Sequence, residues 1–229
     1  MQAKSDFNGT KFLALGAAFP FLLFAFVSIS FAQDLPEIIR DIDARQRKIQ
    51  TMSAQFTQKK ETRLAEAPLL SAGTVKFKRP LRIHFTYTQP EAMEMAIDSR
   101  NLWVYDPGRF RAEKYPLANK RVAQYVTPVT AIFEKTFAGV AEDYDVSYLG
   151  SDGPNHVFRL HPRQAGKVIS RADLRIDKDS GAILRFEMLD PGGDRLTLEF
   201  KNLRINVPIA DEELSIQTPP AVKFQEAGP

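Results

Sequence analysis

From residue 54 onward, apolar and polar residues alternate along much of the chain. Residues 75–78 read Val-Lys-Phe-Lys, and residues 83–88 read Ile-His-Phe-Thr-Tyr-Thr. A period of two is typical of β-strands that bury one face. The same pattern recurs farther along, so the sequence predicts more half-buried strands at residues 144–149, 156–160, 172–176, 183–189 and 196–200.

Turn signals rich in Gly, Pro, Asp and Ser separate these strands, at residues 106–108, 150–153, 179–181 and 191–193. Many short strands at hairpin spacing favour a single antiparallel sheet that is strongly curved or closed toward a barrel. No repeat, linker or low-complexity tract follows residue 32. The sequence therefore predicts one mainly β domain over residues 33–229.

Two segments carry a helical period instead. Between Asp34 and Met52, apolar residues recur at helical spacing among charged ones, which predicts an amphipathic helix with Asp34 as its N-cap. Residues 127–137 predict a short helix started by Pro128, with Ile132 and Phe133 on its apolar side. A helix on the concave face of a curved sheet would act there as a lid.

The first 32 residues have the layout of a secretory signal peptide. Lys4 and Lys11 precede an uncharged run, which ends in Ser30-Phe31-Ala32. A membrane anchor is the alternative, because the apolar run approaches the length that spans a bilayer. The chain has no cysteine, which excludes disulfides, thiolate metal sites and a lipidated N-terminal cysteine. We therefore expect a soluble mature protein in the periplasm.

Charge and motif content point away from nucleic acid and from catalysis. Of 31 basic and 28 acidic residues, two lysines and one aspartate precede residue 33, which leaves a surplus of two positive charges. The basic residues are scattered, which excludes a nucleic-acid footprint. His84, His156 and His161 lack metal-ligand spacing, and we expect His84 and His161 to face solvent. No nucleophile elbow, P-loop or dinucleotide fingerprint is present, so no enzyme, metal or cofactor is predicted.

Aromatic residues indicate an apolar cavity. The chain holds 17 phenylalanines, 6 tyrosines and 1 tryptophan, and most of those after the leader must be core. A curved sheet whose own side chains do not fill its inner face leaves a cavity, which is the usual ligand site in such folds. A hydrolase acting on a lipid or glycan would need polar residues that converge in that cavity.

Four motifs resemble the outer-membrane lipoprotein carrier family, LolA. They are FTQK at residues 56–59, FKRP at 77–80, TQP at 88–90 and LWVYDP at 102–107. A later TPP at 218–220, followed by Ala-Val, resembles the C-terminal strand signature of that family. The resemblance extends over residues 35–224.

The resemblance implies an incomplete, unclosed β-barrel with helices capping its concave face and a hydrophobic cavity for lipoprotein acyl chains. Proteins of this family take lipoproteins from an inner-membrane ATP-driven releasing transporter and hand them to an outer-membrane receptor. We therefore expect a monomeric periplasmic chaperone without cofactor. The alternative on the same fold is a periplasmic sensor of lipid or lipoprotein, or a carrier of another lipid.

The resemblance also implies roles for single residues. Arg79, the arginine of the K-R-P motif, is expected to bond to the lid and favour the closed state. Where the family has Asp-Gly before the L-W strand, this chain has Asp98-Ser99, so a turn that accommodates positive φ must be built differently. The side chains expected to line the acyl-chain cavity are Phe77, Ile83, Phe85, Tyr87, Trp103, Ile132 and Phe133.

Overall fold

The computed structural model describes residues 35–164 and 168–227. The predicted signal peptide and the predicted N-cap Asp34 lie outside these residues. The described part contains, in chain order, α1 (Leu35–Gln46), β1 (Thr51–Glu61), β2 (Leu69–Lys78), β3 (Arg82–Gln89), β4 (Met93–Ile97), β5 (Asn101–Asp106), η1 (Pro107–Arg109), β6 (Arg111–Pro116), α2 (Lys120–Glu134), α3 (Phe137–Ala141), β7 (Tyr144–Asp152), β8 (Asn155–Pro162), β9 (Arg171–Asp177), β10 (Ile183–Leu189), β11 (Arg195–Ile205), η2 (Asp211–Leu214) and β12 (Gln225–Glu226).

All twelve described strands form one sheet in the order β12-β6-β5-β4-β3-β2-β1-β11-β10-β9-β8-β7. Neighbouring strands are antiparallel except β12, which pairs with β6 in parallel. Strands β7 and β12 are the two ends of the sheet and do not pair with each other, so the sheet is not closed. The predicted fold class, an unclosed and mainly β sheet with a few helices, is confirmed.

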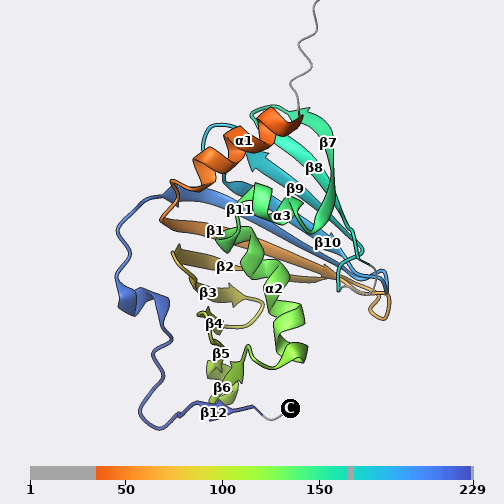
Figure 1. Ribbon diagram of the computed structural model, residues 1–229. Helices are drawn as coiled ribbons and strands as arrows, with labels where there is room; N and C mark the ends of the chain where they lie inside the picture. Colours follow the sequence, from red (N-terminus) through yellow and green to blue (C-terminus); the bar gives the residue numbers. More distant parts are fainter. Residues whose placement is uncertain (1–34, 165–167, 228–229) are drawn as a thin grey trace, which may run out of the picture. The chain divides into compact units, whose positions relative to one another are not determined.

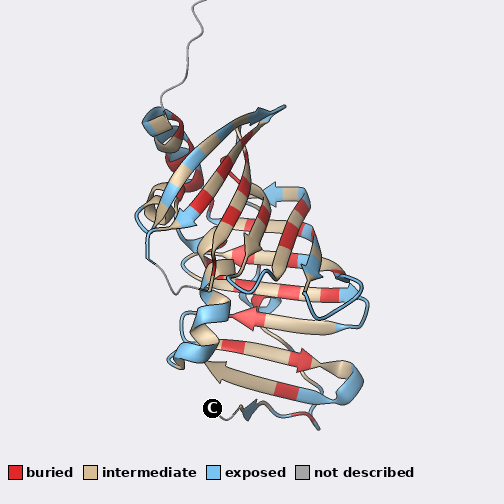
Figure 2. Cartoon of the chain, turned by 90° about the vertical axis from the view of Figure 1, so that its right-hand side faces the viewer, coloured by how far each residue is buried: buried red, intermediate tan, exposed pale blue. Residues whose placement is uncertain are grey.

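Helices α1, α2 and α3 lie on the same face of this sheet (Figures 1 and 2). Along the strands, buried residues alternate with more exposed ones, and the buried ones point to the helix side. In β9, for example, Ala172, Leu174 and Ile176 are buried whereas the residues between them are not. The core therefore lies between the inner face of the sheet and the helices.

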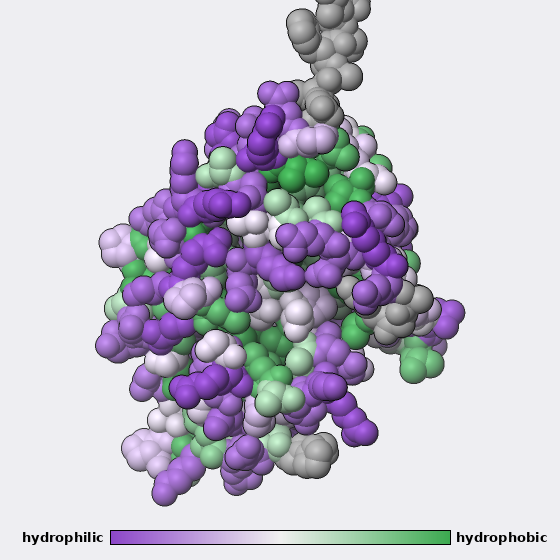
Figure 3. Space-filling view, in the orientation of Figure 1, coloured by the Kyte–Doolittle hydropathy of each residue, from purple (hydrophilic) through white to green (hydrophobic). Residues whose placement is uncertain are grey.

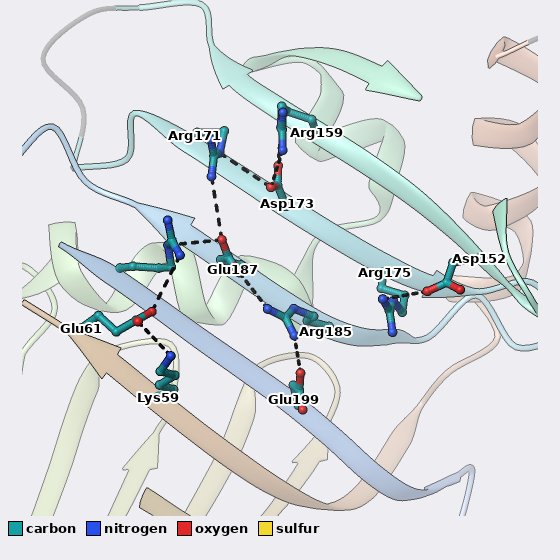
Figure 4. Close-up of polar contacts among 11 residues, drawn as sticks. Lys59, Glu61, Asp152, Arg159, Arg171, Asp173, Arg175, Arg185, Glu187 and Glu199 are labelled. Atoms are coloured by element: carbon teal, nitrogen blue, oxygen red, sulfur yellow. Dashed lines mark hydrogen bonds and ion pairs between the residues drawn. The ribbon is translucent and has the colours of Figure 1, made fainter. Parts of the chain in front are cut away.

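The opposite, outer face of β1 and β8–β11 carries a network of ion pairs (Figure 4). Arg159 donates to Asp173 at 2.8 Å through Nε, and Glu187 lies within ion-pair distance of three arginines from β9, β10 and β11. Because each acidic group faces basic neighbours, the charges neutralise one another. The outer face there is a polar surface and not a site for an anion.

The C-terminal segment crosses the outer face of the other half of the sheet. Asp211 of η2 pairs with Lys78 and with Arg82, and Phe224 packs edge-on against Trp103. His84 donates through Nδ1 to the main-chain carbonyl of Glu213 at 2.9 Å, and its Nε2 lies 2.8 Å from the carboxylate of Glu94. The side chain of His84 is only 11% exposed, so the prediction that it faces solvent is wrong: this segment covers it.

The predicted helix over residues 34–52 is too long at its C-terminal end. Helix α1 ends at Gln46, and the chain turns so that Thr51 pairs with Lys78 and starts β1. Ile49 and Met52 are buried from outside the helix, which explains why their spacing still looked helical. The C-terminal end of α1 is therefore set by the pairing of β1 with β2 and not by the spacing of the apolar residues.

The second helix begins earlier in the structure than the sequence predicts. Helix α2 starts at Lys120, where the side chain of Asn119 accepts a hydrogen bond from the Arg121 amide at 2.9 Å. Pro128 therefore lies inside the helix, where it costs one main-chain hydrogen bond, and does not start it. The helix ends at Glu134, and Phe137 belongs to the separate short helix α3.

Candidate functional site

A cavity of about 440 Å³ lies between helices α2 and α3 and the inner faces of β8, β9 and β10. Apolar side chains of the strands form its floor, and α2 forms its roof. In the space-filling view of this side, apolar surface shows between polar side chains (Figure 3). The main apolar lining comes from Ile132, Phe137, Val140, Leu160, Ile169, Ala172, Leu174 and Phe186.

Several polar groups around this cavity bind one another or the main chain. Lys135, just after α2, forms a 3.3 Å ion pair with Asp143, just before β7. The Gln46 side chain donates to the carbonyl of Gly181 at 3.0 Å and accepts from the amide of Phe137 at 2.7 Å. Among the described residues, no group of three His, Cys, Asp or Glu side chains is placed to hold a metal ion. The cavity therefore suits an apolar ligand.

Asp43 fixes the position of α3 against α1. Its carboxylate accepts from the amide of Ala138 at 3.0 Å and from Arg47 at 2.8 Å. Burial raises the pKa of this carboxyl, but the hydrogen bonds from Thr136, Ala138 and Arg47 outweigh burial and hold the pKa below its ordinary value. Asp43 is therefore charged at neutral pH, and its role is to hold the wall of the cavity.

An aromatic cluster fills the space beneath the C-terminal end of α2. The Phe133 ring of this helix lies 5.6 Å from the ring of Phe77, 6.1 Å from that of Phe85 and 5.7 Å from that of Phe200. Phe56 continues the cluster, with its ring centre 5.2 Å from that of Phe85. These separations are typical of favourable edge-on and tilted aromatic pairs. Phe133 therefore acts as the apolar anchor of α2.

The predicted lining residues on β2 and β3 belong to this packed core. Phe77, Ile83 and Phe85 are at most 3% exposed. Tyr87 donates to Gln58 at 3.2 Å, and burial raises the pKa of its hydroxyl to about 12, so it stays neutral. None of these four lines the 440 Å³ cavity; of the predicted set only Ile132 does. Phe77, Ile132 and Phe133 border a neighbouring void of about 30 Å³.

Trp103 does not lie at the cavity, which corrects the expectation for this residue. Its neighbours Leu102 and Val104 point to the inner core, so Trp103 points to the outer face. There it packs edge-on against Phe224 at 5.0 Å and donates through Nε1 to Asp98 at 3.3 Å. Trp103 therefore fixes the C-terminal segment and the 98–101 turn on the outer side of the sheet.

Arg79 connects the turn between β2 and β3 to the C-terminal ends of two helices, α1 and α2. Its guanidinium donates to the carbonyl of Ile49 at 2.8 Å, to that of Gln46 at 3.4 Å and to that of Glu134 at 3.0 Å. Gln46 and Glu134 are the last residues of α1 and α2. A positive charge at two helix C-termini also interacts favourably with their dipoles.

Helix α2 is thus held mainly at its C-terminal end, by Arg79, Phe133 and the Lys135–Asp143 pair. Its N-terminal half is less buried: residues 120–127 are half-buried or exposed and Tyr125 is 66% exposed, and this half contacts the core through Val122 and Val126. Within residues 35–164 and 168–227, no side chain of this half forms a hydrogen bond with the sheet. The polar and aromatic anchors of α2 therefore lie at one end of the helix.

Fold and site together define a binding protein: an open half-barrel with an apolar cavity under a helical roof. A family described as outer membrane lipoprotein carrier protein LolA matches residues 47–217, and the chain belongs to that family. The members of this family are carriers and not enzymes. Among the described helices, none has the length and apolar run needed to cross a bilayer.

Relatives named outer-membrane lipoprotein carrier protein match most of the chain. The one from Halorhodospira halophila is 25% identical over 197 residues, which is 86% of each chain. The one from Methylibium petroleiphilum is 25% identical over 174 residues, 76% of this chain and 81% of that relative. Their names agree with the description of the matched family.

Solved structures share the fold. An uncharacterized conserved protein from Thermus thermophilus matches with a TM-score of 0.54 at 13% identity, over 84% of this chain and 98% of that one. MucB matches with a TM-score of 0.51 at 16% identity, over 80% of this chain and 62% of MucB. At these identities the likeness concerns the architecture alone.

Proposed function

We propose that this protein binds the acyl chains of lipoproteins in the cavity beneath α2 and carries them through the periplasm from the inner to the outer membrane. The observation that carries the proposal is the 440 Å³ apolar cavity under a helix that is fixed mainly at one end. Membership of the carrier family supports it. An acyl chain needs apolar walls and no converging charges, which this cavity offers.

Opening of α2 would enlarge the binding surface and would also cost energy. If the helix lifts, Phe133 leaves its aromatic partners and the inner residues Phe77, Ile83, Phe85 and Tyr87 become accessible to the cargo. Full burial of three acyl chains at about 0.8 kcal/mol per methylene would exceed the non-covalent limit of roughly 18–21 kcal/mol. A closed state that competes with cargo keeps binding weak enough for release.

In this proposal the protein is loaded by an ATP-driven lipoprotein-releasing transporter of the inner membrane and unloaded at an outer-membrane lipoprotein receptor. Both partners are inferred from the family role and from the proposed direction of transport. The predicted signal peptide at residues 1–32 supports export to the periplasm. Arg79 is the lid-closing residue, because its side chain connects the sheet to the ends of α1 and α2.

A release assay tests the proposal. The protein is added to spheroplasts that display a newly made lipoprotein, and the soluble fraction is examined for a one-to-one complex. We expect release by the wild type and little release by Ala172→Phe, whose ring would enter the cavity from β9. Ala72→Phe on the outer face of β2 is the matched control and should release normally.

The same protein is also tested for uptake of an apolar fluorescent probe. If the wild type takes up the probe and Ala172→Phe does not, but lipoprotein stays on the membrane, a lipid sensor or a carrier of another lipid is favoured. If Ala172→Phe releases lipoprotein as well as the wild type, the cavity is not the binding site and the proposal fails.

A further inference from the structure

The hairpin that joins β1 to β2 ends in an exposed apolar tip. Eight consecutive residues, 63–70, are all exposed, and we call them the hairpin tip. Leu64 is 101% exposed, Leu69 53% and Leu70 61%. In Figure 1 this hairpin extends to the right, next to the β10–β11 turn. Half of the six large, exposed apolar side chains of the described residues therefore lie in the hairpin tip.

The three leucines point in different directions. Leu69 and Leu70 are consecutive strand residues, paired with Lys60 and Lys59, so one side chain projects from each face of the ribbon. Leu64 lies in the loop beyond them. The backbone at the loop is fixed, because the Arg63 amide donates to the Asp194 carboxylate at 3.1 Å and the Ala65 amide to the Thr62 carbonyl at 3.2 Å. The tip thus has a fixed backbone and presents leucines on both faces and in the loop, beside the charged side chains of Arg63 and Glu66.

An exposed aromatic side chain, Phe110, lies at the same edge of the sheet. Phe110 follows η1 in the turn between β5 and β6 and is 74% exposed, with a φ of 50°. A bulky side chain at positive φ is unfavourable, and here no burial compensates for it. The β1–β2 and β5–β6 turns both leave the sheet at this edge, four strand spacings apart, which is about 19 Å measured across the strands. Tyr105 is in register with Gln55. Because β1 and β2 stay paired as far as Lys60 and Leu69, the hairpin tip projects beyond the turn that holds Phe110.

We propose that this edge docks on a lipid bilayer, with the hairpin tip inserted into its interfacial layer. A protein partner contacts one face of a ribbon, whereas a bilayer surrounds a projection that enters it. A tip with leucines on both faces and at its end therefore fits the bilayer better. Residues 59–70 hold three basic and two acidic residues, so apolar insertion rather than charge must supply most of the binding.

The cavity reaches the same edge. Tyr144 begins β7, Ala172 is the second residue of β9, and both line the cavity. In the antiparallel sheet these strand ends lie on the side of the β1–β2 hairpin. A protein held to a bilayer by the hairpin tip thus has its cavity at the membrane surface. This use in acyl-chain transfer rests on the proposed function, whereas the membrane contact itself does not.

Sedimentation with vesicles tests the contact. Protein taken from the exported fraction of expressing cells is mixed with vesicles of phosphatidylethanolamine and a minor share of phosphatidylglycerol. We expect the wild type to sediment with them, also at high salt. The double variant Leu64→Asp/Leu69→Asp should lower the partition coefficient onto the vesicles about tenfold or more, since burial of one leucine side chain alone is worth about that factor in a binding constant.

Leu149→Asp is the matched control. Leu149 is a leucine of similar exposure, 51%, but it lies on β7 and not in the hairpin tip. It should bind vesicles as the wild type does, and all variants should keep the wild-type Tm because none of these leucines is buried. The proposal is overturned if the wild type does not bind vesicles, if the tip variant binds as well as the wild type, or if Leu149→Asp weakens binding equally.

Uptake of an apolar probe in the absence of vesicles separates the two proposals. Loss of vesicle binding with normal probe uptake and normal release of lipoprotein from spheroplasts would confirm the hairpin tip as a membrane contact of an intact carrier. Vesicle binding without any probe uptake would leave the hairpin tip in place and contradict the carrier function.

Discussion

Replacement of Arg79 by leucine should shift the helical roof toward its open state. The change removes all three hydrogen bonds of the guanidinium, of which the one to Glu134 ties α2 to the sheet. A hydrogen bond from a charged donor contributes about 1.5–3 kcal/mol when shielded, and this one is exposed. We therefore assign it about 1 kcal/mol, which is roughly a fivefold change in an equilibrium constant.

The sign of the functional effect follows from the proposed competition between closure and cargo. A closed state that is about 1 kcal/mol less stable leaves more of the protein competent to bind, so the apparent affinity for cargo rises by up to about fivefold. In the proposed mechanism closure of the roof displaces the cargo, so delivery should slow. Arg79→Leu should load lipoprotein normally and pass it on poorly.

Two assays check this expectation. Titration with an apolar fluorescent probe measures the affinity, and transfer of a loaded lipoprotein to outer-membrane acceptors measures delivery. Arg82→Leu is the matched control, because Arg82 bonds to Asp211 on the outer face and does not contact α2. Unchanged affinity together with normal delivery in Arg79→Leu would refute the reasoning, as would an equal effect of Arg82→Leu.

The remaining predictions concern stability. Burial, helped by the charge of Lys178, lowers the pKa of His156 below its ordinary value of 6.5, so unfolding takes up a proton and stability falls as the pH drops through that value. Melting curves from about pH 8 to pH 5.5 should show a smaller decrease in His156→Gln, and equal slopes would contradict the assignment. Gly73→Ala should destabilise by about 1–3 kcal/mol in urea unfolding, because its Cβ would meet the Thr86 carbonyl oxygen at 1.9 Å and the backbone must shift. At Gly139 in α3 an added Cβ has room, so Gly139→Ala should leave the free energy of unfolding unchanged or raise it. A loss of stability similar to that of Gly73→Ala would show that the clash with Thr86 is not the cause.

The alternation of residues predicts most of the sheet because one face of each strand is buried. The pattern fails where apolar residues follow one another without a break. In Leu102-Trp103-Val104-Tyr105 all four residues are apolar, so the sequence gives no phase, and only the pairing of β4 with β5 decides that Trp103 faces outward. The motif resemblance located this strand correctly but not its inner face.

The position of the cavity could not be read from the sequence either. Phe85 and Tyr87 look like cavity residues, yet Phe133 fills the space in front of Phe85. The cavity lies instead over β8–β10, where Ala172 is small and α2 does not reach the sheet closely. Such a void depends on the volumes of facing side chains that are far apart in the chain, and alternation carries no information about volume.

The absence of hydrogen bonds between β7 and β12 has a mechanical consequence. A closed barrel has a radius set by its strand number and stagger, so its interior cannot widen without breaking the hydrogen-bond ladder. Here the sheet ends on both sides, and its curvature can change through small adjustments of twist at every strand pair while each pair stays intact. The half-barrel can therefore change the width of its interior to fit ligands of different bulk.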